Sequence, residues 1–187
     1  MTALTTANQL TLLRMLLIPA FVILVVYGYL GWALVVFATA GITDGLDGLI
    51  ARRSGQKTSL GAWLDPMAAK LLLVTTFVVL TLPGLGLSNR LPIWLTVLII
   101  SRDVVIVLTV AIVNLAIGPR TFRPSIFGKI ATATYIVTAV VAMFFNYQRY
   151  HSVVVDLAVY ASLAITLISS LHYIWHAAQI IEPAARN

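Results

Sequence analysis

The chain has 187 residues, of which 60% are hydrophobic and only 10% are charged, and its formal net charge is +6. A soluble globular domain carries about 25% charged residues. This composition, with a mean hydropathy of +1.00, therefore excludes a soluble domain and indicates a polytopic membrane protein. The absence of cysteine excludes disulfides, thiolate nucleophiles and cysteine-based zinc sites. The positive charge suits a protein beside anionic lipid headgroups, or any inner-membrane protein with basic cytoplasmic loops.

Apolar runs separated by short polar segments predict an all-α fold with six membrane-spanning helices, in one domain that covers residues 1–187. The predicted spans are 8–29, 31–51, 61–82, 92–117, 125–145 and 153–180. The amino terminus has no basic segment and no small-residue cleavage site, so we expect a permanent first span and no removable signal peptide. In that span Asn8, Thr11 and Arg14 share one face. They form either an interfacial anchor or a polar stripe turned toward a site in the bundle.

The charges of the loops predict the orientation of the chain in the membrane. Basic residues concentrate in the segments 52–60 and 118–124, whereas the loops after the first, third and fifth spans hold few. By the positive-inside rule we expect these two segments and both termini on the cytoplasmic side of the inner membrane.

Three of the six acidic residues, Asp44, Asp47 and Asp65, fall at the ends of two consecutive predicted spans. At 1.5 Å per residue they would lie about 5 to 12 Å below the cytoplasmic face. Carboxylates in such a place are costly without a cation, and oxygen ligands without histidine or cysteine favour Mg²⁺, Mn²⁺ or Ca²⁺ over zinc. Basic residues in the adjoining loop would help to hold a diphosphate. The alternative is that the aspartates cap helix ends or pair with arginines, for which Arg14, Arg52 and Arg102 are available.

The same stretch matches a long sequence signature, D-x-x-D-G-x-x-A-R, then eight residues, then G-x-x-x-D-x-x-x-D. Seven positions agree: Asp44, Asp47, Gly48, Ala51, Arg52, Gly61 and Asp65. In this stretch the chain resembles the CDP-alcohol phosphatidyltransferases. The resemblance implies a six-span enzyme, commonly a homodimer, in which an alcohol hydroxyl attacks the lipid-side phosphorus of CDP-diacylglycerol and expels CMP.

The resemblance also implies roles for individual residues. Asp44, Asp47 and Asp65 would bind divalent metal, with two ions per site when an aspartate occupies position 69. Gly48 and Ala51 would leave room for the cytidine nucleotide, and Arg52 would contact its phosphates. Asn8 and Thr11, on the polar face of the first span, are expected to line the same nucleotide site.

Position 69 departs from the signature, because alanine stands where the family has its last aspartate. In the family that carboxylate is thought to deprotonate the attacking hydroxyl and to help bind the second metal. A positioned general base contributes roughly 10²- to 10⁴-fold to the rate. With Ala69 the chain is expected to bind nucleotide but to be nearly inactive. It is either an enzyme with one changed residue or a natural non-catalytic relative.

Basic residues outside the signature bear on the acceptor alcohol. Arg102 lies inside the fourth predicted span and needs an anion. Asp103 is expected to be a poor partner, because adjacent helical residues point about 100° apart. A phosphorylated acceptor would satisfy Arg102, Arg123 and Lys129 together, although positive-inside anchoring also explains Arg123 and Lys129.

Glycerol 3-phosphate is the expected acceptor, since the opening N-Q-L-T-L-L-R is similar to the first helix of phosphatidylglycerophosphate synthases. Phosphatidylglycerol, as in cardiolipin synthases, and inositol phosphate are the alternatives. A cation transporter and a non-catalytic lipid-binding protein are the competing classes. A transporter would predict inverted repeats and broken helices near the midplane, and neither is visible. Nucleic-acid binding is not expected, since the basic residues are spread over membrane-facing loops.

Overall fold

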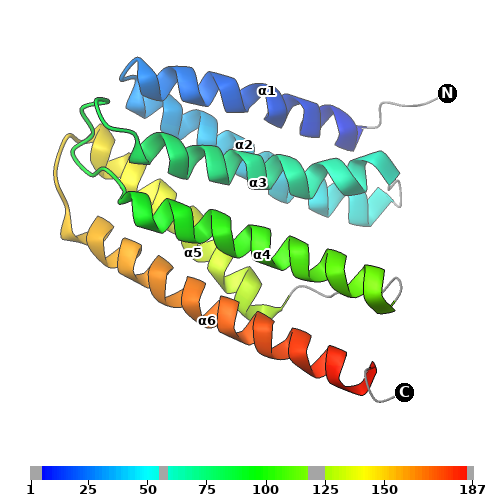
Figure 1. Ribbon diagram of the computed structural model, residues 1–187. Helices are drawn as coiled ribbons and strands as arrows, with labels where there is room; N and C mark the ends of the chain where they lie inside the picture. Colours follow the sequence, from blue (N-terminus) through cyan, green and yellow to red (C-terminus); the bar gives the residue numbers. More distant parts are fainter. Residues whose placement is uncertain (1–5, 55–58, 118–124, 185–187) are drawn as a thin grey trace. The chain divides into compact units, whose positions relative to one another are not determined.

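The computed structural model describes the backbone of residues 6–54, 59–117 and 125–184, and the side chains of residues 9, 11–44, 66–112, 115 and 125–175. These segments form six α-helices and contain no strand (Figure 1). The helices are α1 Thr6–Val26, α2 Leu30–Ser54, α3 Ser59–Thr81, α4 Ile93–Ile117, α5 Ile126–Tyr147 and α6 Val153–Ala184. The all-α prediction is confirmed, and each helix overlaps one predicted span.

Three of these helices are long and apolar enough to cross a membrane over residues 93–112, 126–147 and 153–175. The other three hold shorter apolar stretches, over residues 11–26, 30–44 and 66–81. One bound of each stretch, at residue 11, 44 or 66, coincides with the limit of the described side chains. Among the described residues, three helices are thus long and apolar enough to span a membrane, as in an integral membrane protein.

The chain divides into two compact units, and the first comprises residues 1–90 and 139–152. In it α1 contacts both α2 and α3, and α2 also contacts α3. The interior is apolar, and the rings of Phe21 and Phe37 lie 6.1 Å apart between α1 and α2. Phe77 and Leu80 of α3 are fully buried in the same unit.

Two helix ends in this unit have the same hydrogen-bonded form. At the end of α1, Tyr29 N donates to Leu24 O and Gly28 N donates to Val25 O, which is the Schellman motif closed by a left-handed residue. Gly28 has the required positive φ of 78°. At the end of α5, Tyr150 N donates to Phe145 O and Arg149 N donates to Asn146 O. Here an arginine takes the left-handed position with a φ of 54°, where glycine is usual.

A pair of asparagines ties the loop before α4 to the end of α5. Asn89 N donates to Asn146 Oδ1 at 2.7 Å, and Asn146 Nδ2 donates to Asn89 O at 3.1 Å. The Asn89 side chain also donates to Tyr150 O at 2.7 Å and accepts from Ser152 N at 2.9 Å. Both asparagines are buried, so these bonds satisfy loop backbone groups that water does not reach.

The second unit comprises residues 91–138 and 153–187, and in it α4 contacts α6. Its core combines apolar residues such as Leu95 and Ile99 with hydroxyl pairs. Tyr135 Oη lies 2.7 Å from Thr166 Oγ1, and Thr138 Oγ1 lies 2.8 Å from Ser162 Oγ. These pairs join α5 to α6 by hydrogen bonds in an otherwise apolar interior.

Candidate active site

The first predicted metal ligand, Asp44 of α2, is paired with an arginine of α1. Arg14 Nη1 lies 2.6 Å from Asp44 Oδ1; the Arg14 side chain is fully buried, whereas that of Asp44 is 44% exposed. The alternative that an aspartate pairs with Arg14 therefore holds for Asp44. It does not exclude metal binding, because an ionised carboxylate has two oxygens and accepts several partners. A half-exposed carboxylate oxygen is a ligand of the kind that a hard divalent cation prefers.

The polar face of α1 is turned inward and is not an interfacial anchor. Thr11 and Arg14 are both fully buried. A nucleotide could reach Thr11 only if the helices around it moved apart. The side chain of Asn8 lies outside the described residues. Arg14 was not predicted to be a site residue, although its spacing of three from Thr11, at the start of an apolar span, already marked it.

The rest of the signature is located by its backbone alone. Asp47, Gly48, Ala51 and Arg52 lie on α2, beyond Asp44, and Asp65 lies on α3. Their side chains fall outside the described residues, so the predicted three-carboxylate cluster stays a prediction. Ala69 lies one turn after Asp65 on α3 and is partly buried.

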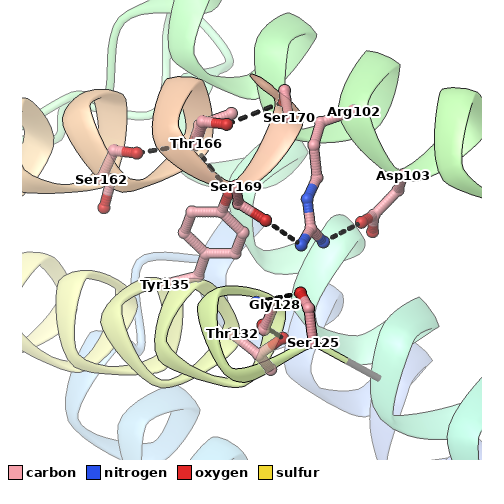
Figure 2. A network of polar contacts seen from close by, with 10 residues as sticks. All are labelled: Arg102, Asp103, Ser125, Gly128, Thr132, Tyr135, Ser162, Thr166, Ser169 and Ser170. Carbon is pink, nitrogen blue, oxygen red and sulfur yellow. Dashed lines mark hydrogen bonds and ion pairs between the residues drawn. The ribbon is translucent and has the colours of Figure 1, made fainter. Parts of the chain in front are cut away.

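The predicted acceptor residue Arg102 lies at the centre of a polar network between α4, α5 and α6 (Figure 2). Its Nη1 donates to Asp103 Oδ1 at 2.9 Å, and its Nη2 donates to Ser169 Oγ at 2.7 Å. The expectation that Asp103 is a poor partner is therefore wrong. Although the two Cα–Cβ bonds diverge, the arginine side chain is long enough for its guanidinium to turn back to the neighbouring carboxylate.

Arg102 keeps unused donor capacity in this network. Its side chain is 9% exposed, and its Nε has no hydrogen-bond partner among the described residues. The guanidinium lies close to the backbone of Gly128 in α5, because a Cβ at that position would be only 3.3 Å from Nη2. The exposed Lys129 is the next residue along α5. Arg123 lies outside the described residues.

The hydroxyl groups of α6 were not predicted to take part. Ser162, Thr166 and Ser169 are buried and are spaced four and three residues apart, which places them on one face of the helix. Figure 2 shows this face directed at Tyr135 and Arg102. In the sequence the only signal is this spacing inside an apolar run.

The chain was compared with known proteins. The family model for CDP-alcohol phosphatidyltransferase matches residues 4–175. The chain belongs to the CDP-alcohol phosphatidyltransferase family. The resemblance carried by the signature is thus confirmed, and the chain belongs to a family of transferases of phospholipid biosynthesis. Enzymes of this family generally depend on a divalent metal.

Several relatives have names within the family. A probable phosphatidylglycerophosphate synthase of Mycobacterium tuberculosis is 34% identical over 179 residues, which cover 90% of this chain and 79% of the relative. The CMP-forming cardiolipin synthase of Streptomyces coelicolor is 37% identical over 117 residues, or 59% of this chain and 52% of that enzyme. The human CMP-forming cardiolipin synthase is 35% identical over 162 residues, or 76% of this chain and 52% of that enzyme.

Proposed function

We propose that the chain has the architecture of an enzyme that transfers a phosphatidyl group from CDP-diacylglycerol to glycerol 3-phosphate and releases CMP. The observation that carries this choice is the similarity to the mycobacterial phosphatidylglycerophosphate synthase, which extends over 90% of the chain. Cardiolipin synthesis, with phosphatidylglycerol as acceptor, is the second candidate, because two cardiolipin synthases are 35% and 37% identical over shorter segments.

In this proposal Asp44, Asp47 and Asp65 hold Mg²⁺ or Mn²⁺, two ions when position 69 is an aspartate. A bound divalent ion would neutralise the diphosphate oxygens and stabilise the departing CMP. Arg14 contacts Oδ1 of Asp44 and fixes the orientation of the carboxylate from α1, which leaves the second oxygen for the metal. Support comes from the 2.6 Å contact and from the unequal burial of the pair.

The nucleotide would lie along α2, with Gly48 and Ala51 providing space and Arg52 contacting the phosphates. Asn8 would line the same site from α1. Thr11 would support the wall of that site by packing, since it is fully buried. Holding donor and acceptor in line is then the main contribution of the protein to the rate.

The phosphate of the acceptor would be bound by Arg102, Arg123 and Lys129. Arg102 already uses two of its five donor hydrogens on Asp103 and Ser169, so donors remain for an incoming anion. Asp103 offsets the charge of the buried guanidinium until that anion arrives. Gly128, with no side chain, lets the guanidinium lie close to the start of α5, where Lys129 is the next residue.

We further propose six membrane spans, with both termini and the active site on the cytoplasmic side of the inner membrane, and assembly into a homodimer. The basic segments 52–60 and 118–124 support the orientation. The apolar stretches in the described parts of α1, α2 and α3 support the three additional spans, because each continues into a longer helix.

The test is CMP release by the Ala69→Asp variant, supplied with CDP-diacylglycerol, Mg²⁺ and one acceptor at a time. We expect activity with glycerol 3-phosphate to rise by about 10²- to 10⁴-fold over the unchanged chain, because a general base is restored. Ala69→Asn is the matched control, since it has the same shape without a base. Activity with phosphatidylglycerol alone would favour the second candidate. If the Ala69→Asp variant released no CMP with any acceptor, the chain would be a non-catalytic relative.

A further inference from the structure

A groove in the first unit lies at the end of α2 farthest from Asp44. It has a volume of about 580 Å³, within the range of ligand sites. Its lining consists of Gly28, Tyr29, Leu30, Gly31, Trp32, Leu34, Val35, Phe144, Tyr147 and Arg149. Gly31 is 13 residues from Asp44, so at 1.5 Å per residue the groove lies about 20 Å along α2 from the candidate active site.

We propose that this groove binds an anionic glycerophospholipid of the membrane leaflet opposite the active site. Its phosphate would pair with Arg149, and an acyl chain would lie on Trp32, Val35 and Phe144. The proposal does not depend on which acceptor the active site uses.

The chemistry of the lining favours a lipid over a water-soluble ligand. Of these ten described residues none is acidic and Arg149 alone is charged, while the remainder are apolar, aromatic or glycine. Trp32 is 67% exposed and Tyr147 is 56% exposed. Tryptophan, tyrosine and arginine are the residues that occupy the boundary between hydrocarbon and headgroups. The groove also lies where the apolar stretches 11–26 and 126–147 end and 30–44 begins, which is the level of that boundary.

Arg149, the charged residue of the groove, adopts a backbone conformation that is unfavourable for an arginine. Arg149 closes the Schellman motif of α5 in the left-handed conformation, with a φ of 54°. At the opposing helix end, Gly28 fills the same position without strain. An arginine at a position where glycine fits better points to a use for its charge, since unfavourable backbone conformations gather at ligand sites.

Part of the groove is formed by the side chain of Tyr147, at the end of α5, lying against α2 at Gly31. A Cβ at Gly31 would lie 2.8 Å from Tyr147 Cε2, so only glycine lets the tyrosine ring lie against this part of α2. The ring in this position forms an apolar surface between the two helices, on which an acyl chain can pack.

The experiment uses Trp32 as a local reporter in vesicles. Replacing the other three tryptophans, Trp63, Trp94 and Trp175, with phenylalanine leaves Trp32 as the only source of tryptophan fluorescence. The variant is reconstituted in phosphatidylcholine that contains either brominated phosphatidylglycerol or, at the same fraction, brominated phosphatidylcholine. We expect the anionic lipid to be enriched at Trp32 by about fivefold, as one arginine at an anionic surface implies.

Arg149→Asn separates lipid binding from folding, because asparagine tolerates the left-handed conformation better than arginine and carries no charge. This variant is expected to keep its melting temperature while the preference for phosphatidylglycerol falls to about one. Arg90→Asn, which removes an exposed arginine of the same unit outside the groove, is the matched control and should retain the preference.

Three results would overturn the proposal. The first is that the Arg149→Asn variant keeps the preference for phosphatidylglycerol over phosphatidylcholine. The second is that the Arg90→Asn variant loses this preference to the same extent as Arg149→Asn. The third is the absence of quenching by either lipid, because the groove would then be covered by protein, for example a second copy of the chain. Native mass spectrometry of the chain with all its tryptophans gives a second readout, the number of phosphatidylglycerol molecules retained with and without Arg149.

Discussion

Arg14 and Asp44 form an ion pair whose two members differ in burial, the guanidinium being fully enclosed and the carboxylate 44% exposed. The enclosed member depends on the exposed one, because a buried guanidinium that loses its counter-charge has no access to water. Asp44 therefore has a structural task in addition to its proposed role as a metal ligand. The two tasks can be separated by measuring stability without metal.

Replacing Asp44 with alanine should lower the free energy of unfolding in metal-free detergent by about 2 kcal/mol. This is less than the roughly 3–5 kcal/mol of a fully buried pair, because water reaches the carboxylate. The double variant Asp44→Ala/Arg14→Met removes the stranded charge and should recover most of the loss. Denaturant or thermal unfolding checks both values. A double variant as unstable as the single one would show that the pair does not stabilise the fold.

Asn89→Ala should destabilise the first unit by about 2–3 kcal/mol, because the carbonyl of Tyr150 and the amide of Ser152 lose their partners. Hydrogen exchange should show faster exchange at residues 148–152. Ser88→Ala is the matched control. It removes an exposed side chain and keeps the backbone carbonyl that lies 3.3 Å from His151 Nδ1. Equal exchange in the two variants would contradict this account of the asparagine pair.

Arg149→Gly should raise the free energy of unfolding by about 1 kcal/mol by relieving the left-handed strain. For a chain of 150–250 residues this corresponds to an increase in melting temperature of roughly 2–4 °C. Thermal unfolding in zwitterionic detergent is the measurement, because anionic lipid bound to the unchanged chain would offset the difference. A fall in melting temperature under those conditions would mean that the arginine itself stabilises the turn.

In the Ala69→Asp background, Arg102→Lys should raise the KM for glycerol 3-phosphate by about tenfold, because lysine cannot reproduce the forked donor geometry. The KM for CDP-diacylglycerol should stay unchanged. Ser169→Ala removes one contact of the same guanidinium and should change the acceptor KM by less than about threefold. If the KM values for glycerol 3-phosphate and CDP-diacylglycerol rose equally, Arg102 would support the packing of the helices and would not bind the acceptor phosphate.

The unchanged chain should bind CDP-diacylglycerol only in the presence of a divalent ion. Removing Mg²⁺ with a chelator should weaken binding by about tenfold or more, since the diphosphate loses its main counter-charge. Asp47→Asn should have a similar effect even when Mg²⁺ is present. Calorimetric titration gives both values without turnover, so Ala69 does not interfere. If CDP-diacylglycerol bound equally well without a divalent ion, the proposed metal site would be ruled out.

The fold followed closely from the sequence because hydropathy and helix-ending residues act locally. The end of α3 at Thr81 is set by Pro83 and Gly84, and the start of α4 at Ile93 follows Pro92, so no distant contact was needed to predict them. The seven signature positions predicted the family for the same reason, since their spacing is a property of one continuous stretch.

Contacts between distant segments could not be predicted in this way. The pairing of Asn89 with Asn146 joins the loop before α4 to the last turn of α5, 57 residues further along the chain, and the loop shows no periodic pattern. The ion pair of Arg102 with Asp103 was misjudged because helical geometry fixes the direction of Cβ but not where a long side chain ends. Arg149 looked like an ordinary loop arginine, since its positive φ appears only in three dimensions.

The tyrosine ring that occupies the place of a side chain at position 31 makes the sizes of residues 31 and 147 interdependent. Among relatives that keep this contact, a bulkier residue at 31 should occur only together with a smaller one at 147. A relative with two large residues there would have to turn the side chain at 147 away from α2, which would change the shape of the groove.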